Sequence, residues 1–172
     1  MLPEDWSAWA RAFRRRPLWE PAASTARVSL GRSEIERLIP HRAPFLLIDE
    51  ITAVDLKQSA AQARRVIDAD DSIFRGHFPG DPVYPGVLQL EMVGQLGVWL
   101  AQRLRASEEG ISIRAIKVHH AVFAVPVLPG EAVDVRARIL ADDDTTAIVA
   151  GQVTGAAGIA SIAAMELYRV ES

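Results

Sequence analysis

Apolar side chains occupy nearly every position from Val87 until the polar stretch Gln102–Arg105. A helix with almost no polar face must be covered by other parts of the chain on most of its sides. The residues that follow can supply this cover, because segments rich in Val, Ile and Ala alternate there with short turns. These expected strands are residues 111–119, 132–140, 145–154 and 159–170. We therefore predict an α+β fold in which an antiparallel sheet wraps around one long central helix.

The first half of this region contains shorter patterns. Ser33–Glu36 fits a capping box and predicts a short helix that Pro40 limits. Residues 45–51 are almost all apolar and predict a buried strand, and residues 58–67 predict a second, more polar strand. Residues 76–86 hold three prolines and three glycines, which is typical of an ordered loop with fixed backbone dihedrals.

Residues 1–24 differ from the rest, because they contain three of the four tryptophans and a run of three arginines, Arg14–Arg16. Trp6, Trp9, Ala10 and Phe13 form the apolar stripe of an amphipathic helix that Pro17 would end. We expect a helical extension at 1–24 before a single domain at 25–172. The stripe can pack on its own domain or on a sister subunit; alternatively, the extension docks an acidic partner through Arg14–Arg16.

Charge and composition exclude several function classes. The formal net charge is −3, which gives no general attraction to nucleic acid or to an anionic membrane. The chain has no cysteine, so a thiol nucleophile and a zinc-thiolate site are excluded. The apolar stretch 83–101 carries Gln89, Glu91 and Gln95, which argues against a membrane span, and the first residues show no secretory signal. We expect a cytoplasmic protein without a membrane span.

Candidate chemistry is concentrated between Gly76 and Gln95. The backbone N–H groups at the start of the long helix, from about Gly86 to Leu88, would form a partial positive charge that suits an oxyanion. Glu91 lies about 7.5 Å further along the helix axis and shares a face with Gln95. A carboxylate in such apolar surroundings must be paired, hydrogen-bonded or neutralised.

His77 precedes the stiff loop, which can hold its imidazole in one orientation near the helix start. Imidazole accepts a proton near neutral pH. A histidine base, a carboxyl acid and a helix-terminal oxyanion site are together what is needed to remove a proton next to a thioester carbonyl while a β-hydroxyl departs. Taken singly, Glu91 could equally be a structural hydrogen-bonding group, and His77 a packing residue.

The segments His77–Pro82 and Pro85–Val87, with Glu91, Gln95 and the upstream Leu38–Asp49, resemble the FabZ-type 3-hydroxyacyl-(acyl-carrier-protein) dehydratases. The resemblance covers residues 34 to about 170. It implies the hotdog fold, a homodimer or a trimer of dimers, and an acyl tunnel at the dimer interface that takes its histidine and glutamate from two subunits. The implied reaction is dehydration of a (3R)-3-hydroxyacyl thioester on acyl carrier protein to the trans-2-enoyl thioester, with no cofactor and no metal.

The same resemblance assigns roles to individual residues. His77 would take the α proton, Glu91 would assist departure of the hydroxyl, and the Gly86 N–H would polarise the thioester carbonyl. Val87, Tyr84 and Phe78 are expected along the acyl path, with packing as the alternative for Tyr84, Phe78 and also Phe45. Gln95 is expected to orient its neighbours. A structural hydrogen bond is favoured for His41, and no chemistry is assigned to His119 or His120.

One departure from the family concerns the partner. Arg or Lys commonly follows Phe123 in this family, whereas Ala124 and Val125 stand here. Carrier docking would then use other cations, such as Arg14–Arg16, Arg42, Arg103 or Arg105. Together with the extension, this suggests a dehydratase of polyketide or aryl-polyene assembly rather than of housekeeping fatty acid synthesis. Two alternatives remain: a hotdog acyl thioesterase, and a non-catalytic subunit that binds acyl thioesters.

Overall fold

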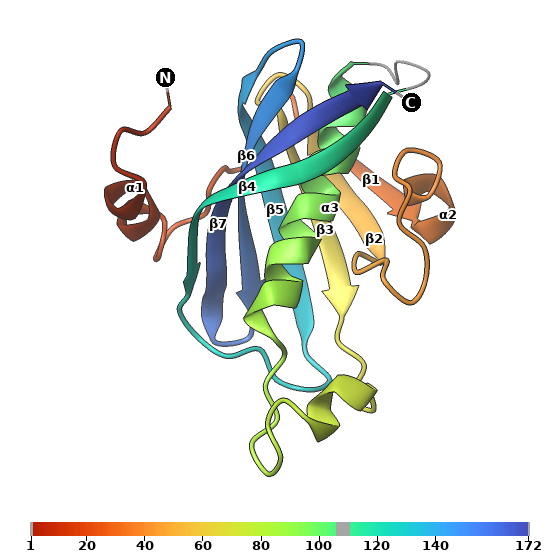
Figure 1. Ribbon diagram of the computed structural model, residues 1–172, viewed down its shortest axis with the longest axis vertical. Helices are drawn as coiled ribbons and strands as arrows, with labels where there is room; N and C mark the ends of the chain where they lie inside the picture. The colour runs from red at the N-terminus through yellow and green to blue at the C-terminus, as the bar shows by residue number, and fades with distance from the viewer. Residues whose placement is uncertain (1, 106–110, 172) are drawn as a thin grey trace.

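The computed structural model describes residues 2–105 and 111–171, which form a seven-stranded antiparallel sheet around the helix α3 (Gly86–Leu104) (Figure 1). The strand order is β1-β2-β3-β5-β6-β7-β4. The strands are β1 (Ala26–Gly31), β2 (Glu50–Asp55), β3 (Ala60–Val66), β4 (Ile111–Phe123), β5 (Ala132–Asp142), β6 (Thr146–Gly155) and β7 (Gly158–Glu171). Two short helices, α1 (Trp6–Ala12) and α2 (Arg32–Ile35), and a 3₁₀ helix (Ser72–Arg75) complete the fold. The α+β hotdog architecture expected from the sequence is confirmed.

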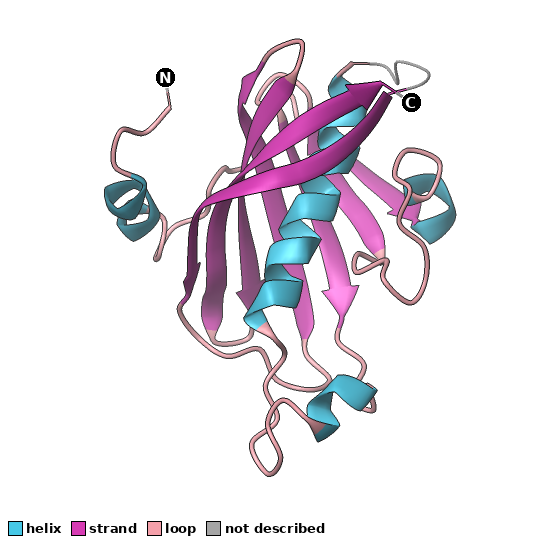
Figure 2. Cartoon of the chain, in the orientation of Figure 1, coloured by secondary structure: helices cyan, strands magenta, loops and turns pink. Residues whose placement is uncertain are grey.

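Helix α3 lies close against the concave face of the sheet (Figure 2). Its side chains from Met92 to Ala101 are all buried. Small residues permit the close approach, because a Cβ built on Gly151 of β6 would lie 2.2 Å from Cγ1 of Val93. Likewise, a Cβ on Gly97 would lie 2.9 Å from the Val149 side chain. Within the described residues, no helix has both the length and the apolarity that a membrane crossing requires.

The four strands expected after α3 are present as β4, β5, β6 and β7. Strands β4 and β5 continue past their predicted C-terminal ends, β6 lies one residue later in the chain than predicted, and β7 is one residue longer at each end. The largest difference is in β4, which continues to Phe123 because its last residues remain paired with the start of β7, where Phe123 lies opposite Ser161. The more polar expected strand at 58–67 corresponds to β3. Strand β4 is therefore long, and it forms one edge of the sheet.

The buried strand predicted at 45–51 is wrong in its position. Leu46, Leu47 and Ile48 are buried as expected, but they have no strand conformation, and β2 begins only at Glu50. The reason is that the Leu47 N–H donates to the side-chain Oε1 of Gln95 at 2.8 Å instead of to a neighbouring strand. Strand β1, which pairs with β2, was not expected from the sequence, because its residues are partly or fully exposed and show no apolar run.

The predicted capping box at Ser33–Glu36 is also incorrect. Helix α2 begins at Arg32, and Gly31 at its N-cap makes no side-chain capping bond. The Ser33 hydroxyl instead donates to the carboxylate of its neighbour Glu34 at 3.0 Å. A hydroxyl used in this way cannot cap the helix.

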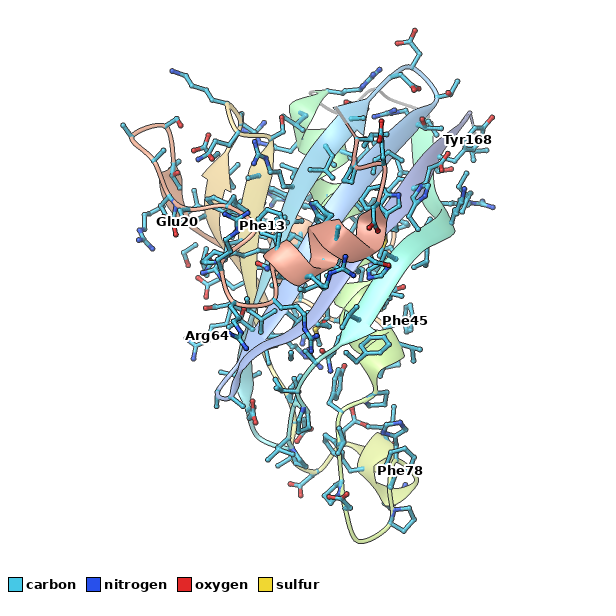
Figure 3. The ribbon with its side chains drawn as sticks, turned by 90° about the vertical axis from the view of Figure 1, so that its left-hand side faces the viewer. Phe13, Glu20, Phe45, Arg64, Phe78 and Tyr168 are labelled. Carbon is cyan, nitrogen blue, oxygen red and sulfur yellow. The ribbon has the colours of Figure 1, made fainter. Side chains whose placement is uncertain are left out.

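The N-terminal segment packs on the outer face of the sheet, where α1 lies across the strands (Figure 3). Asp5 caps α1 by accepting from the Ser7 and Ala8 N–H groups. Leu18 and Trp19 are buried in an apolar cluster with Ala53, Ala60 and Ala150 of three strands, against which Trp9 and Phe13 also pack. The aromatic stripe thus packs on its own chain, as the first alternative proposed, and the Arg14–Arg16 run is left exposed.

Candidate active site

His77 is held in place by backbone hydrogen bonds on both of its sides. Its N–H donates to the Ile73 carbonyl at 3.0 Å, and its own carbonyl accepts from the Val83 N–H at 3.0 Å. Its ring Nδ1 lies 2.8 Å from the Val83 carbonyl oxygen, and the ring stacks on Phe78 with centroids 4.0 Å apart. A carbonyl only accepts, so Nδ1 carries the proton and donates it. This assignment leaves Nε2 with a free lone pair, as a base requires.

A cavity of about 480 Å³ joins His77 to the N-terminus of α3. Within the described residues, the N–H groups of Gly86 and Val87 have no acceptor. The expectation that Leu88 also offers a free N–H is wrong, because that group donates to the Pro85 carbonyl at 3.1 Å in a tight first turn. Phe123 forms the opposite wall, and a Cβ on Gly86 would lie 2.6 Å from its ring. Glycine therefore permits this wall to approach the two amides.

The aromatic and apolar residues expected along the acyl path lie at different depths. Tyr84 is 3% exposed and packs against Phe74, and burial raises the pKa of its hydroxyl to about 12. Tyr84 also lines the cavity that contains His77, so its position fits both the acyl path and the packing alternative. Phe78 and Val87 are more than half exposed. Phe78 lies on the loop that projects beyond the sheet, further from the strands than Phe45 (Figure 3).

Glu91 lies in a second cavity, of about 310 Å³, on another side of α3. Its side chain is 30% exposed, so the carboxylate is less buried than the sequence predicts. Its Oε1 accepts from Gln95 Nε2 at 2.9 Å and lies 3.4 Å from His41 Nε2. Phe45, also in this cavity, is half exposed. The structural hydrogen bond expected for His41 stays a prediction, because its Nε2 contacts the candidate acid at 3.4 Å and its buried Nδ1 has no hydrogen-bond partner among the described residues.

Gln95 connects Glu91 to the segment before β2. Its Oε1 accepts from the Leu47 N–H, and its Nε2 donates to the Phe45 carbonyl at 2.7 Å as well as to Glu91. The residue is 1% exposed, so these bonds are shielded from water. This geometry is that of a residue that orients its neighbours.

Gln89 is a residue of the first cavity to which the sequence analysis gave no role. It is 2% exposed, and its buried Oε1 has no hydrogen-bond partner in the described part of the chain. It lines the same cavity as His77. The feature of the sequence that could have pointed to Gln89 is its position as a polar residue among apolar ones, one turn into a buried helix.

His77 and Glu91 do not face each other within one chain. Their cavities have no lining residue in common. Five residues of helix separate Gly86 from Glu91, which corresponds to a rotation of about 140° around the axis of α3. His119 and His120 are outside both cavities, and His119 lies 3.1 Å from Glu166 and stacks on Trp6.

Comparisons with known proteins identify relatives of this chain. The model of the FabA-like domain matches residues 39–165. A 3-hydroxyacyl-(acyl-carrier-protein) dehydratase FabZ from Protochlamydia amoebophila is 39% identical over 103 residues, which are 60% of this chain and 66% of the relative. The enzyme of the same name from Campylobacter fetus is 37% identical over 112 residues, which are 62% of this chain and 75% of the relative.

Two solved structures share the fold. The dehydratase heterocomplex ApeI:P from Xenorhabdus doucetiae has a TM-score of 0.63 at 17% identity and covers 80% of this chain and 91% of its own. A mutant thioesterase from Pseudomonas aeruginosa has a TM-score of 0.61 at 17% identity and covers 81% and 94%. Dehydratases and thioesterases therefore share this fold, and the distinction must come from sequence and site. The family model covers most of the chain, and the chain belongs to the FabA-like family.

Proposed function

We propose that this protein dehydrates (3R)-3-hydroxyacyl thioesters on acyl carrier protein to trans-2-enoyl thioesters. The observation that carries the proposal is the cavity in which an imidazole with a free Nε2 lies beside two unpaired N–H groups of the α3 N-terminus. The FabZ relatives, whose names state this activity, support it. An imidazole beside an oxyanion site could also activate a water for thioester hydrolysis, so the preference for elimination over hydrolysis rests on the FabZ relatives.

The proposed active site takes Glu91 from a second copy of the chain. Strand β4 is an edge strand on which residues 114–118 are all exposed, among them the apolar Ile116 and Val118. A long, exposed, apolar edge is prone to pair with another strand. We assign its partner as β4 of a second copy, in an antiparallel pair about a twofold axis.

The two cavities lie at opposite ends of β4, so this pairing would bring the His77 cavity of one copy beside the Glu91 cavity of the other. Phe123, at the C-terminal end of the strand, lines the His77 cavity, and Ile113–Ala115, at the N-terminal end, line the Glu91 cavity. Antiparallel pairing about an axis near Val118 places the N-terminal end of one strand beside the C-terminal end of the other. Each His77 cavity would then adjoin the Glu91 cavity of the partner subunit, giving two sites per dimer. A trimer of such dimers is compatible with the same interface.

The reaction follows from these positions. The thioester carbonyl oxygen lies toward the Gly86 and Val87 N–H groups, which stabilise the negative charge that develops on it; removing one such donor elsewhere costs about 3 kcal/mol of barrier. Nε2 of His77 takes the α proton, and the electrons of the C–H bond form the new double bond. The β C–O bond breaks, and the departing hydroxide leaves as water with a proton from the Glu91 carboxyl or from a water that Glu91 holds.

Turnover of carrier-bound 3-hydroxyacyl substrates of several chain lengths tests the proposal, with enoyl absorbance and free thiol recorded in parallel. We expect enoyl product without thiol release, and a loss of on the order of a hundredfold or more in kcat for His77→Ala and for Glu91→Gln. Release of free thiol without enoyl product would establish the thioesterase instead. Unimpaired dehydration by His77→Ala would refute the role assigned to the imidazole.

A further inference from the structure

A groove of about 870 Å³ lies on the outer face of the sheet, beneath the N-terminal segment. Arg11, Arg14 and Arg15 line it from that segment, and Arg136 of β5 and Thr154 of β6 line it from the sheet. The described lining residues thus include four arginines and no carboxylate. Arg11 is ion-paired with Asp5 at 3.7 Å, so Arg14, Arg15 and Arg136 are the cations that make this groove suited to an anion.

Two polar groups of the groove are buried without a partner. Nε of Arg136 and Oγ1 of Thr154 are inaccessible to solvent, and neither has a hydrogen-bond partner among the described residues. Leaving such groups unpaired costs free energy, which an incoming acceptor would recover once it displaced the atoms that cover them. A guanidinium presents N–H groups in a planar fork that matches phosphate oxygens, and a hydroxyl adds a further donor. The groove therefore favours a phosphate among anions.

The N-terminal segment is fixed where it contributes its arginines. Gln152 of β6 is fully buried, and its Nε2 donates to the carbonyls of Phe13 at 2.7 Å and Arg16 at 3.0 Å. Its Oε1 accepts from the Leu18 N–H at 2.6 Å. These bonds lie on both sides of Arg14 and Arg15, so the backbone that carries the two arginines is anchored to the sheet.

The groove adjoins the proposed active site. Ala124 and Val125 line both the groove and the cavity that contains His77. The two spaces therefore adjoin at residues whose side chains are small and uncharged. A ligand with a reactive thioester at one end and a phosphate at the other would pass over these two residues to occupy both spaces.

We propose that this groove binds the phosphate of the phosphopantetheine arm that carries the substrate, with Arg136, Thr154 and the arginines of the N-terminal segment as its ligands. The inference rests on the proposed function, because a substrate on acyl carrier protein is attached through a phosphopantetheine arm with the thioester at one end and the phosphate at the other. The N-terminal segment is then part of the substrate-binding site as well as of the fold. A basic residue at position 124 or 125 is then not required for carrier binding, because the arginines of the neighbouring groove supply the positive charge.

Two matched thioesters test this inference: a 3-hydroxyacyl pantetheine thioester, and the same compound with a 4′-phosphate. In the wild-type protein, we expect the phosphorylated compound to have the lower KM. In Arg136→Gln, KM for the phosphorylated compound should rise on the order of tenfold more than KM for the pantetheine compound. The double variant Arg14→Ala/Arg15→Ala, whose side chains are exposed and leave the core intact, should show the same selective loss. Arg27→Ala, on the exposed edge strand β1, is the matched control and should change neither value.

Direct binding keeps this test independent of turnover. Calorimetry with 4′-phosphopantetheine and with pantetheine measures the contribution of the phosphate even if the protein catalyses no dehydration. Tighter binding of the phosphorylated compound, lost in both arginine variants, supports the groove. Equal affinity of the wild-type protein for the two compounds, or an equal effect of the variants on both, would overturn it. Failure of the proposed function is a different result, namely that neither thioester is dehydrated.

Discussion

The substitution Gln95→Leu removes the side chain that connects Glu91 to the segment before β2. Leucine is similar in volume, so the main loss is of three hydrogen bonds, to the Leu47 N–H, the Phe45 carbonyl and the Glu91 carboxylate. The first two groups are backbone groups in a buried or half-buried setting, and each costs about 1–3 kcal/mol when left unpaired. Burial of the more apolar leucine offsets about 1–2 kcal/mol. We expect the free energy of unfolding to fall by about 2–4 kcal/mol.

Urea unfolding followed by tryptophan fluorescence measures this loss. Gln62→Leu is the control, because Gln62 is a half-buried glutamine of β3 outside this network, where we expect a change within about 0.5 kcal/mol. The dehydratase activity of Gln95→Leu should also fall, since Glu91 loses its orienting donor. A loss of stability no larger than that of Gln62→Leu would refute the claim that the Gln95 side chain replaces strand pairing at Leu47.

Three further predictions concern the sheet. Gly151→Ala should destabilise the fold by about 3 kcal/mol or more in urea, because its Cβ would lie 2.2 Å from Val93; an unchanged midpoint would contradict the packing. Backbone hydrogen bonds from Thr146 and Thr145 lower the pKa of Asp143 to about 2, so the contribution of its carboxylate to stability is complete above pH 4 and is lost as the pH falls through 2. The difference in free energy of unfolding between wild type and Asp143→Ala should therefore become smaller as the pH falls from 4 to 2. A difference that stays constant over this range would refute the stabilising role of the Asp143 carboxylate. Val118→Lys should convert the proposed β4–β4 dimer to monomers in analytical ultracentrifugation, and an unchanged mass would place the interface elsewhere.

The sequence predicted those parts of the fold in which local pattern and tertiary environment agree. The all-apolar stretch after Gly86 required a covered helix, and Val- and Ile-rich segments separated by turns supplied the sheet. The loop at 76–86 fixes the orientation of His77 as expected, because its prolines restrict the backbone locally and its Val83 carbonyl binds the imidazole.

The failures occurred where a distant side chain decides the local structure. Residues 45–48 are apolar enough for a strand, but Gln95, 48 residues away, binds the Leu47 N–H. Strand β1 has a weak apolar pattern and is stabilised by pairing with β2. The sequence likewise placed Glu91 deeper than it lies, because it could not show that the carboxylate lines a cavity in which its side chain is 30% exposed.

The central claim is that each active site combines His77 of one subunit with Glu91 of the other. Its most direct test is a mixed dimer, purified through two different tags, in which one subunit carries His77→Ala and the other carries Glu91→Gln. One of its two sites then holds both substitutions and the other holds neither. We predict that the mixed dimer has about half the kcat of wild type per dimer, although each parent homodimer is inactive. A mixed dimer no more active than its parents would contradict the shared site.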